Sequence, residues 1–244
     1  MGKKQKDHFI ARHTFEIRFK NRNLTFMDYK GEMGDYIIKK MDWENLKLTG
    51  SRFDIANNNF DKILFFSWEN FGLQIEVSND FEDFKDYINK LFEILDEFKK
   101  YKVGDISRIG IKSSIFYHKY GIGVDEVKSI YKNIMLKDSG VIEKKMGGKI
   151  VDTGFLAINM QSDAKFVNFT TGPMTKNEVI SKIFKNDLYD SFNHKSGIYF
   201  DIDLSQKDLN FDNLDKLKEW ALESSSSIEK KFKGFIDYFF SLDN

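Results

Sequence analysis

Residues 78–100 read SNDFEDFKDYINKLFEILDEFKK, and this stretch decides the fold. Its large apolar side chains recur at spacings of three and four, which places them on one face of an α-helix. The polar residues at 78–80 can cap the start of this helix, and Gly104 can end it just after several lysines. We therefore expect a long amphipathic helix that packs on a sheet. Its apolar face consists of Phe81, Phe84, Ile88, Leu91, Leu95 and Phe98.

A second amphipathic helix is expected after Asp212 or Asn213, either of which can cap it. A run of serines at 224–227 predicts a bend or a close contact with another element, because serine is a modest helix former. The last turns are apolar nearly all round, so we expect them to be covered by the rest of the chain or by another subunit. The candidate interaction surface there consists of Phe235, Tyr238, Phe239 and Phe240.

Alternation of apolar and polar residues predicts strands before each of these helices. The clearest are residues 9–20, the hairpin formed by 63–68 and 73–77, the strand 106–117, the pair 151–160 and 164–171, and the strand 197–204. The expected fold is α+β, with antiparallel sheet covered by two long amphipathic helices. It allows two similar β-then-α halves, 8–104 and 105–244, after a flexible tail at 1–7; the halves can also form one compact domain.

Composition excludes several classes of function. The 244 residues contain no cysteine, so disulfides, thiolate metal sites and cysteine nucleophiles are absent. Lys and Arg number 38, as do Asp and Glu, and this balance argues against a nucleic-acid binder. No apolar run is long enough for a membrane span or a secretory signal. We expect a cytoplasmic protein without a membrane partner, and nothing in the sequence calls for a cofactor.

Several short stretches resemble a sporadically distributed, functionally uncharacterised family of prokaryotic proteins about 250 residues long. The clearest is Arg-Ile-Gly-Ile-Lys at 108–112, which is similar to the family's Arg-Ile-Gly-Leu-Arg-Tyr. The strand at 198–203, which ends in Asp-Ile-Asp, is similar to the family's Leu-Leu-Asp-Ile-Asp. The early strand at 15–19, the Phe-x-x-Phe of 81–84 and the long last helix also fit. The resemblance implies an intact prokaryotic domain and supplies no reaction or ligand.

Four charged residues in otherwise apolar strands form the main candidate site: Arg108, Lys112, Asp201 and Asp203. Residues two or four apart in a strand point to the same face, so Asp201 lies beside Asp203, and Arg108 is on the same face as Lys112. The aspartates offer a weak candidate site for Mg²⁺ or Mn²⁺, and the basic pair is suited to a carboxylate or phosphate. We favour a third interpretation, in which Arg108 pairs with Asp201 or Asp203 across adjacent strands because an unpaired charge there is costly.

No catalytic constellation stands out elsewhere. The histidines at 8, 13, 118 and 194 lack zinc-site spacing, and the Gly-rich stretches at 121–125 and 146–149 lack the phosphate-loop pattern. We therefore interpret the chain as a non-enzymatic binding or protein-interaction module, with a protein partner or a second copy in a homodimer. Two alternatives are a metal-dependent phosphoester enzyme that uses Asp201 and Asp203, and a small-ligand carrier with a cavity between sheet and helices.

Overall fold

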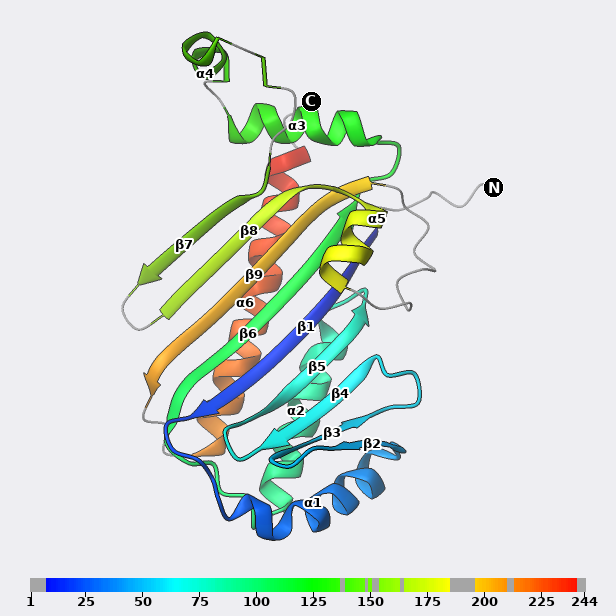
Figure 1. Ribbon diagram of the computed structural model, residues 1–244, viewed down its shortest axis with the longest axis vertical. Coiled ribbons are helices and arrows are strands. Elements are labelled where there is room, and N and C mark those ends of the chain that lie inside the picture. Colours follow the sequence, from blue (N-terminus) through cyan, green and yellow to red (C-terminus); the bar gives the residue numbers. More distant parts are fainter. Residues whose placement is uncertain are drawn as a thin grey trace.

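The computed structural model describes residues 8–136, 139–147, 149–150, 154–162, 165–184, 196–209 and 213–240. The predicted tail at 1–7 and His194 lie outside the described residues. The α+β prediction is confirmed: nine antiparallel strands form one sheet, and long helices cover one side of it (Figure 1). The strands are β1 (His8–Phe19), β2 (Asn45–Leu48), β3 (Arg52–Ala56), β4 (Lys62–Ser67), β5 (Asn70–Ser78), β6 (Ile106–His118), β7 (Leu156–Ser162), β8 (Lys165–Thr175) and β9 (Ser196–Leu209). The helices are α1 (Phe26–Met41), α2 (Glu82–Glu97), α3 (Val124–Met135), α4 (Ser139–Met146), α5 (Lys176–Val179) with the adjoining π-helical turn η1 (Ile180–Phe184), and α6 (Leu214–Phe240).

The strand order β2-β3-β4-β5-β1-β6-β9-β8-β7 is nearly symmetric about its centre. β1 and β6 are the first strands of the two halves, and they pair along their whole length, from His8 opposite His118 to Phe19 opposite Ile106. Outward from this pair, the first half adds β5, β4, β3 and β2, and the second half adds β9, β8 and β7. A helix follows the first strand in each half, and a long helix closes each half. The two halves thus share one continuous sheet.

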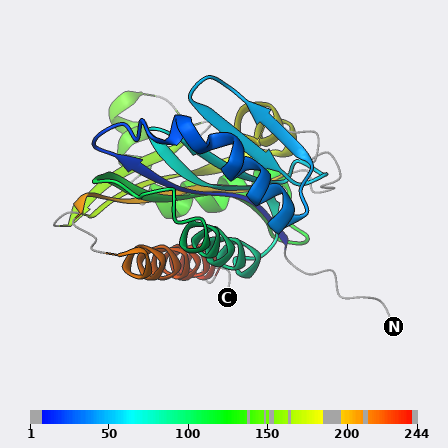
Figure 2. The same cartoon turned by 90° about the horizontal axis from the view of Figure 1, so that it is seen from below.

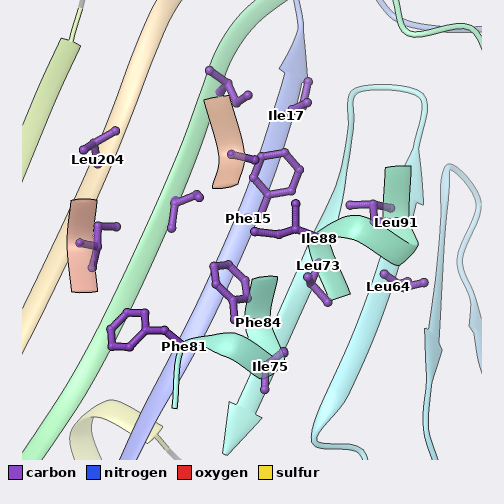
Figure 3. Packing of buried hydrophobic residues seen from close by; sticks show 14 of the residues in the cluster. Phe15, Ile17, Leu64, Leu73, Ile75, Phe81, Phe84, Ile88, Leu91 and Leu204 are labelled. Atoms are coloured by element: carbon purple, nitrogen blue, oxygen red, sulfur yellow. The ribbon is translucent and has the colours of Figure 1, made fainter. Parts of the chain in front are cut away.

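The inner face of the sheet is apolar and packs on α2 and α6, which lie side by side beneath it (Figure 2). In the first half, Phe15 and Ile17 of β1 meet Phe84, Ile88 and Leu91 of α2, and all five side chains are fully buried (Figure 3). Burying aliphatic and aromatic side chains of this size contributes about 1.5–3 kcal/mol each, so this layer holds the sheet and helices together.

Helix α2 begins and ends inside the predicted range. The carboxylate of Asp80 accepts the backbone N–H of Asp83 at 2.9 Å, which satisfies one of the free donors at the helix start. Gly104 was expected to end this helix, and that expectation is wrong, because the last helical residue is Glu97. Phe98 leaves the helical conformation, with φ −86° and ψ 72°, and turns the chain toward Tyr101, which is buried against β4.

Helix α6 runs without interruption through the serines at 224–227, so no break occurs there. Ser224 and Ser225 are buried, as is the neighbouring Ala221. Tertiary packing therefore outweighs the modest helix propensity of serine, and the small side chains suit a helix packed closely on its surroundings.

The outer face of the sheet carries α5 and η1 at one end, seen in front of the strands in Figure 1. These short elements cover a small apolar cluster that Ile10, Phe116 and Tyr199 form on the outer face. Thr175 starts α5 through a capping box, in which its hydroxyl accepts the N–H of Glu178 and the Glu178 carboxylate accepts the N–H of Thr175.

Candidate functional site

The outer face of the central strands carries a group of polar side chains that we call the polar face cluster. The alternation of each strand sends its apolar residues inward to α2 and α6 and these residues outward. The register aligns them in rows: Lys112 lies opposite Thr14 on one side and Asp203 on the other, and Ser114 lies opposite Asp201. The cluster consists of Arg12, Glu16, Arg18, Glu76, Arg108, Lys112, Asp201 and Asp203.

Arg108 and Asp203 form the central ion pair of this cluster. Nη2 of Arg108 donates to Oδ1 of Asp203 at 2.9 Å and to Oδ2 at 3.1 Å. Nη1 lies 3.8 Å from Oε2 of Glu16. The same guanidinium therefore forms ion pairs with carboxylates of both neighbouring strands, β1 and β9. Both Arg108 and Asp203 are 23% exposed, which shields the pair partly from solvent. The expected pairing across adjacent strands is present.

Gly110 makes room for this geometry. A Cβ atom at Gly110 would lie 3.0 Å from the guanidinium carbon and both terminal nitrogens of Arg108. The Arg108 side chain therefore lies across the glycine of its own strand, where a side chain would obstruct it. The absence of a side chain at Gly110 thus makes room for the guanidinium.

Lys112 and Asp201 form the second ion pair, with Nζ 2.9 Å from Oδ2. The hydroxyl of Ser114 donates to the other oxygen of Asp201 at 3.4 Å. Lys112 is 46% exposed, twice as much as Arg108, so this pair is the more accessible to a partner. Burial raises the pKa of nearby Tyr199, and the Asp201 carboxylate raises it further, so this phenol stays protonated.

The residues that β1 and β5 contribute to the cluster were not predicted from the sequence. Glu16 accepts hydrogen bonds from Arg18 at 2.7 Å and from the Asn70 amide at 2.6 Å. Arg12 lies 4.0 Å from Glu76. Burial raises the pKa of the Glu76 carboxyl, while the Arg12 charge acts in the opposite direction. The sequence does carry one signal for them: the charged residues of β1 alternate with its core residues and so share one face of the strand.

The pairing determines what the cluster can do chemically. Asp201 and Asp203 each lie within hydrogen-bond distance of a cation, Lys112 and Arg108 respectively, rather than converging on an open position. Across the described ranges, no group of three or more histidine and carboxylate side chains is arranged to hold a metal ion. The arrangement suits electrostatic recognition of a partner better than metal or phosphate chemistry, which requires ligands that are not already neutralised.

A buried histidine lies on the opposite face of the same strands. His13 of β1 is fully buried between Phe81 and Phe84, and its Nδ1 lies 2.8 Å from the Ser113 hydroxyl of β6. Burial lowers the pKa of His13 to about 3, although the negative charges of Asp80 and Glu229 oppose this shift. The site is closed to ligands, so His13 has a structural role. The other ring nitrogen of His13, Nε2, is buried without a hydrogen-bond partner. Nδ1 of His118 lies 2.6 Å from the carbonyl oxygen of Ser196.

The candidate interaction surface on α6 is mostly covered within the chain. Phe235 stacks on Phe169 with ring centroids 4.5 Å apart, and the fully buried Phe239 stacks on Tyr131. Phe240 packs against Tyr117 at 5.6 Å. Tyr238, at 44% exposure, is the most accessible of the four predicted residues. The end of α6 that appeared apolar all round therefore contacts β6, β8 and α3 of its own chain.

A pocket of about 420 Å³ opens between the end of α2 and the start of α6. Leu95, Val103, Leu214 and Leu217 line it together with the charged side chains of Lys99 and Lys102. It lies at the rim of the helical layer, and its lining includes no strand residue, so it does not match the expected cavity between sheet and helices.

Comparison with known proteins adds no assignment: no family model and no curated protein matches this sequence. The resemblance of residues 108–112 and 198–203 to a prokaryotic family therefore stays a prediction. Among the described helices, none is both long and apolar enough to cross a membrane.

Proposed function

We propose that this chain is a non-enzymatic protein-interaction module that presents its polar face cluster to a partner polypeptide. The observation that carries the proposal is the cross-strand pairing of Arg108 with Asp203 and of Lys112 with Asp201. This pairing leaves a surface of alternating positive and negative charge on the outer face of the sheet. Complementary charge patterns of this kind give specificity between proteins. A nucleic acid would instead require cations without carboxylates beside them.

The alternatives are less well supported by the geometry. A metal-dependent phosphoester enzyme would need Asp201 and Asp203 to face a common open position, whereas each is engaged by its own cation. A small-ligand carrier would need a cavity under the sheet, whereas the pocket described above lies between helix ends. The prediction of a cytoplasmic, prokaryotic protein belongs to the same proposal and rests on the sequence.

Site-specific photo-crosslinking tests the proposal. A benzophenone amino acid replaces the exposed Lys207, at the rim of the polar face cluster, or, as the matched control, the exposed Lys231 on α6. In cells that naturally express the chain, we expect a discrete protein adduct from position 207 that position 231 does not give. The charge reversal Lys112→Glu, which removes the pair with Asp201, should weaken that adduct. No adduct at position 207, or the same adducts at both positions, would contradict the proposal.

A further inference from the structure

β7, the outermost strand of the second half, has an exposed edge. The corresponding edge in the first half is covered by an additional strand. Because the strand order is symmetric about the β1–β6 pair, β7 occupies the position that β3 occupies in the first half. β3 pairs with β4 on one side and with β2 on the other. β7 pairs with β8, and the described residues include no strand on its other side. Figure 1 shows β7 at the margin of the sheet.

The two end strands of the sheet differ in the features that prevent edge pairing. Natural edge strands are usually kept short or carry charged residues such as lysine. β2 follows this rule: it has four residues, and its Lys47 lies opposite Asp54. β7 has seven residues, LAINMQS, with neither a charge nor a proline. Residues 157–161 of β7 are all exposed.

An uncovered apolar strip runs along β7 on the side of the sheet that faces the helices. Ile158 lies opposite Phe169 of β8, and Met160 lies opposite Val167. Phe169 is buried under Phe235 of α6, whereas Ile158 and Met160 are 38% and 48% exposed. The strip therefore continues the core layer beyond the reach of α6.

We propose that β7 pairs antiparallel with β7 of a second copy of this chain, about a two-fold axis at Asn159. This register places Ile158 of each copy opposite Met160 of the other, on the helix side of one continuous sheet. Asn159 meets Asn159 on the outer side. Apolar cross-strand pairs of this kind stabilise a sheet, and no like charges meet. A two-fold contact uses the same surface on both subunits, which this uncharged strand satisfies by itself.

The second copy is favoured over an unrelated strand because β7 complements itself in both side-chain size and charge. The polar face cluster lies on β1, β5, β6 and β9 and takes no part in this contact. The dimer is therefore independent of the protein partner proposed above, and either can fail without the other.

Cysteine cross-linking tests the register directly, because the natural chain contains no cysteine. Directly opposite residues of antiparallel strands have Cβ atoms about 4.5–5.5 Å apart, near the span of a disulfide. Under mild oxidation we expect Asn159→Cys to form a covalent dimer on a non-reducing gel. The matched control Leu48→Cys on β2, where the native side chain is 58% exposed, should remain monomeric. Equal cross-linking of the two variants would overturn the proposal.

Light scattering across a tenfold concentration range tests the same contact without cross-linking. The wild type should approach twice the chain mass of 28.7 kDa as concentration rises. Ile158→Lys should stay at the single-chain mass, because it sets a charge against Met160 of the second copy. Tyr238→Lys on α6 should dimerise like the wild type. Circular dichroism confirms that both variants fold. A wild type at 28.7 kDa throughout, or a dimer lost with Tyr238→Lys but kept with Ile158→Lys, would overturn the proposal.

Discussion

The two halves of this molecule follow the same chain order but differ at their outer strands and in the short helices beside them. Each half begins with a central strand, passes through a helix and a series of adjacent strands, and closes with a long helix on the inner face. The first half adds β2 as an outer strand, whereas α4 precedes β7 in the second half. The shared elements are those that bury the core. The elements that differ lie toward the margins of the sheet, where β2 is the end strand of the first half and β7 that of the second.

The largest expected effect concerns the buried contacts that the halves share. Leu91→Ala in α2 and Leu217→Ala in α6 each remove a buried leucine, so each should lower the free energy of unfolding by about 2–5 kcal/mol. Because β1 and β6 join the halves into one sheet, each variant should unfold in a single urea transition. Two separate transitions would show that the halves are independent. A decrease in the free energy of unfolding below about 0.5 kcal/mol would show that the leucine in question is not part of the core.

The second effect is a pH dependence at the seam between the halves, where His13 of β1 meets Ser113 of β6. Burial lowers the pKa of His13 to about 3 in the folded chain, against 6.5 for an ordinary histidine. Between these two pKa values the unfolded state binds more protons than the folded state. The stability that comes from keeping His13 neutral in the core is therefore fully present above pH 6.5 and is lost as the pH falls toward 3. Its slope is at most about 1.4 kcal/mol per pH unit.

His13→Phe should remove that slope, because a phenylalanine has no proton to bind. The pH slope is compared rather than the absolute stability, which the loss of the hydrogen bond to Ser113 also lowers. Urea unfolding of both proteins at several pH values between 7 and 4 measures the difference. The variant should lose less stability than the wild type as the pH falls. The same loss in both proteins would exclude His13 as a source of acid sensitivity.

The smallest effect compares the starts of the two long helices. Asp80 accepts the N–H of Asp83 at 2.9 Å, and Asn213 accepts the N–H of Lys216 at 3.0 Å, so the same three-residue spacing caps both helices. Asp80→Ala and Asn213→Ala should each lower stability by about 1 kcal/mol in urea unfolding. The exposed Asp86→Ala is the control, with a change within about 0.5 kcal/mol. If Asp80→Ala or Asn213→Ala lowers stability no more than the control does, that residue does not cap its helix.

Much of this fold was predictable because periodicity is a local property. Alternation identified β1, β6 and β9, and the spacing of three and four identified α2 and α6. Helix α1 was not predicted. Its fully buried Phe26, Met33 and Ile37 lie on one face at spacings of seven and four, but Gly31 and Gly34 lower the helix propensity of this stretch. The strand order depends on long-range pairing, such as β1 with β6, which the alternation in a single strand does not encode.

In the candidate site, too, local patterns predicted some residues, while others depended on contacts between distant parts of the chain. Arg108 and Asp203 could be matched from the sequence because each interrupts an apolar strand. Glu16, Arg12 and Glu76 were not matched, because their positions read as the ordinary solvent face of β1 and β5. Whether Phe235 or Phe239 faces a partner or the chain's own core depends on α3 and β8, and no pattern within α6 reveals those neighbours.

We propose that the polar face cluster is neutralised by its own ion pairs rather than by a bound ion. Thermal unfolding of the wild type, Arg108→Ala and the double variant Arg108→Ala with Asp203→Ala, each with and without Mn²⁺, tests it directly. We predict that Arg108→Ala is less stable than the double variant, because it leaves Asp203 uncompensated, and that Mn²⁺ shifts none of the three. A contrary result would be an Arg108→Ala protein as stable as the wild type, together with a wild type that saturating Mn²⁺ stabilises by about 2.7 kcal/mol or more.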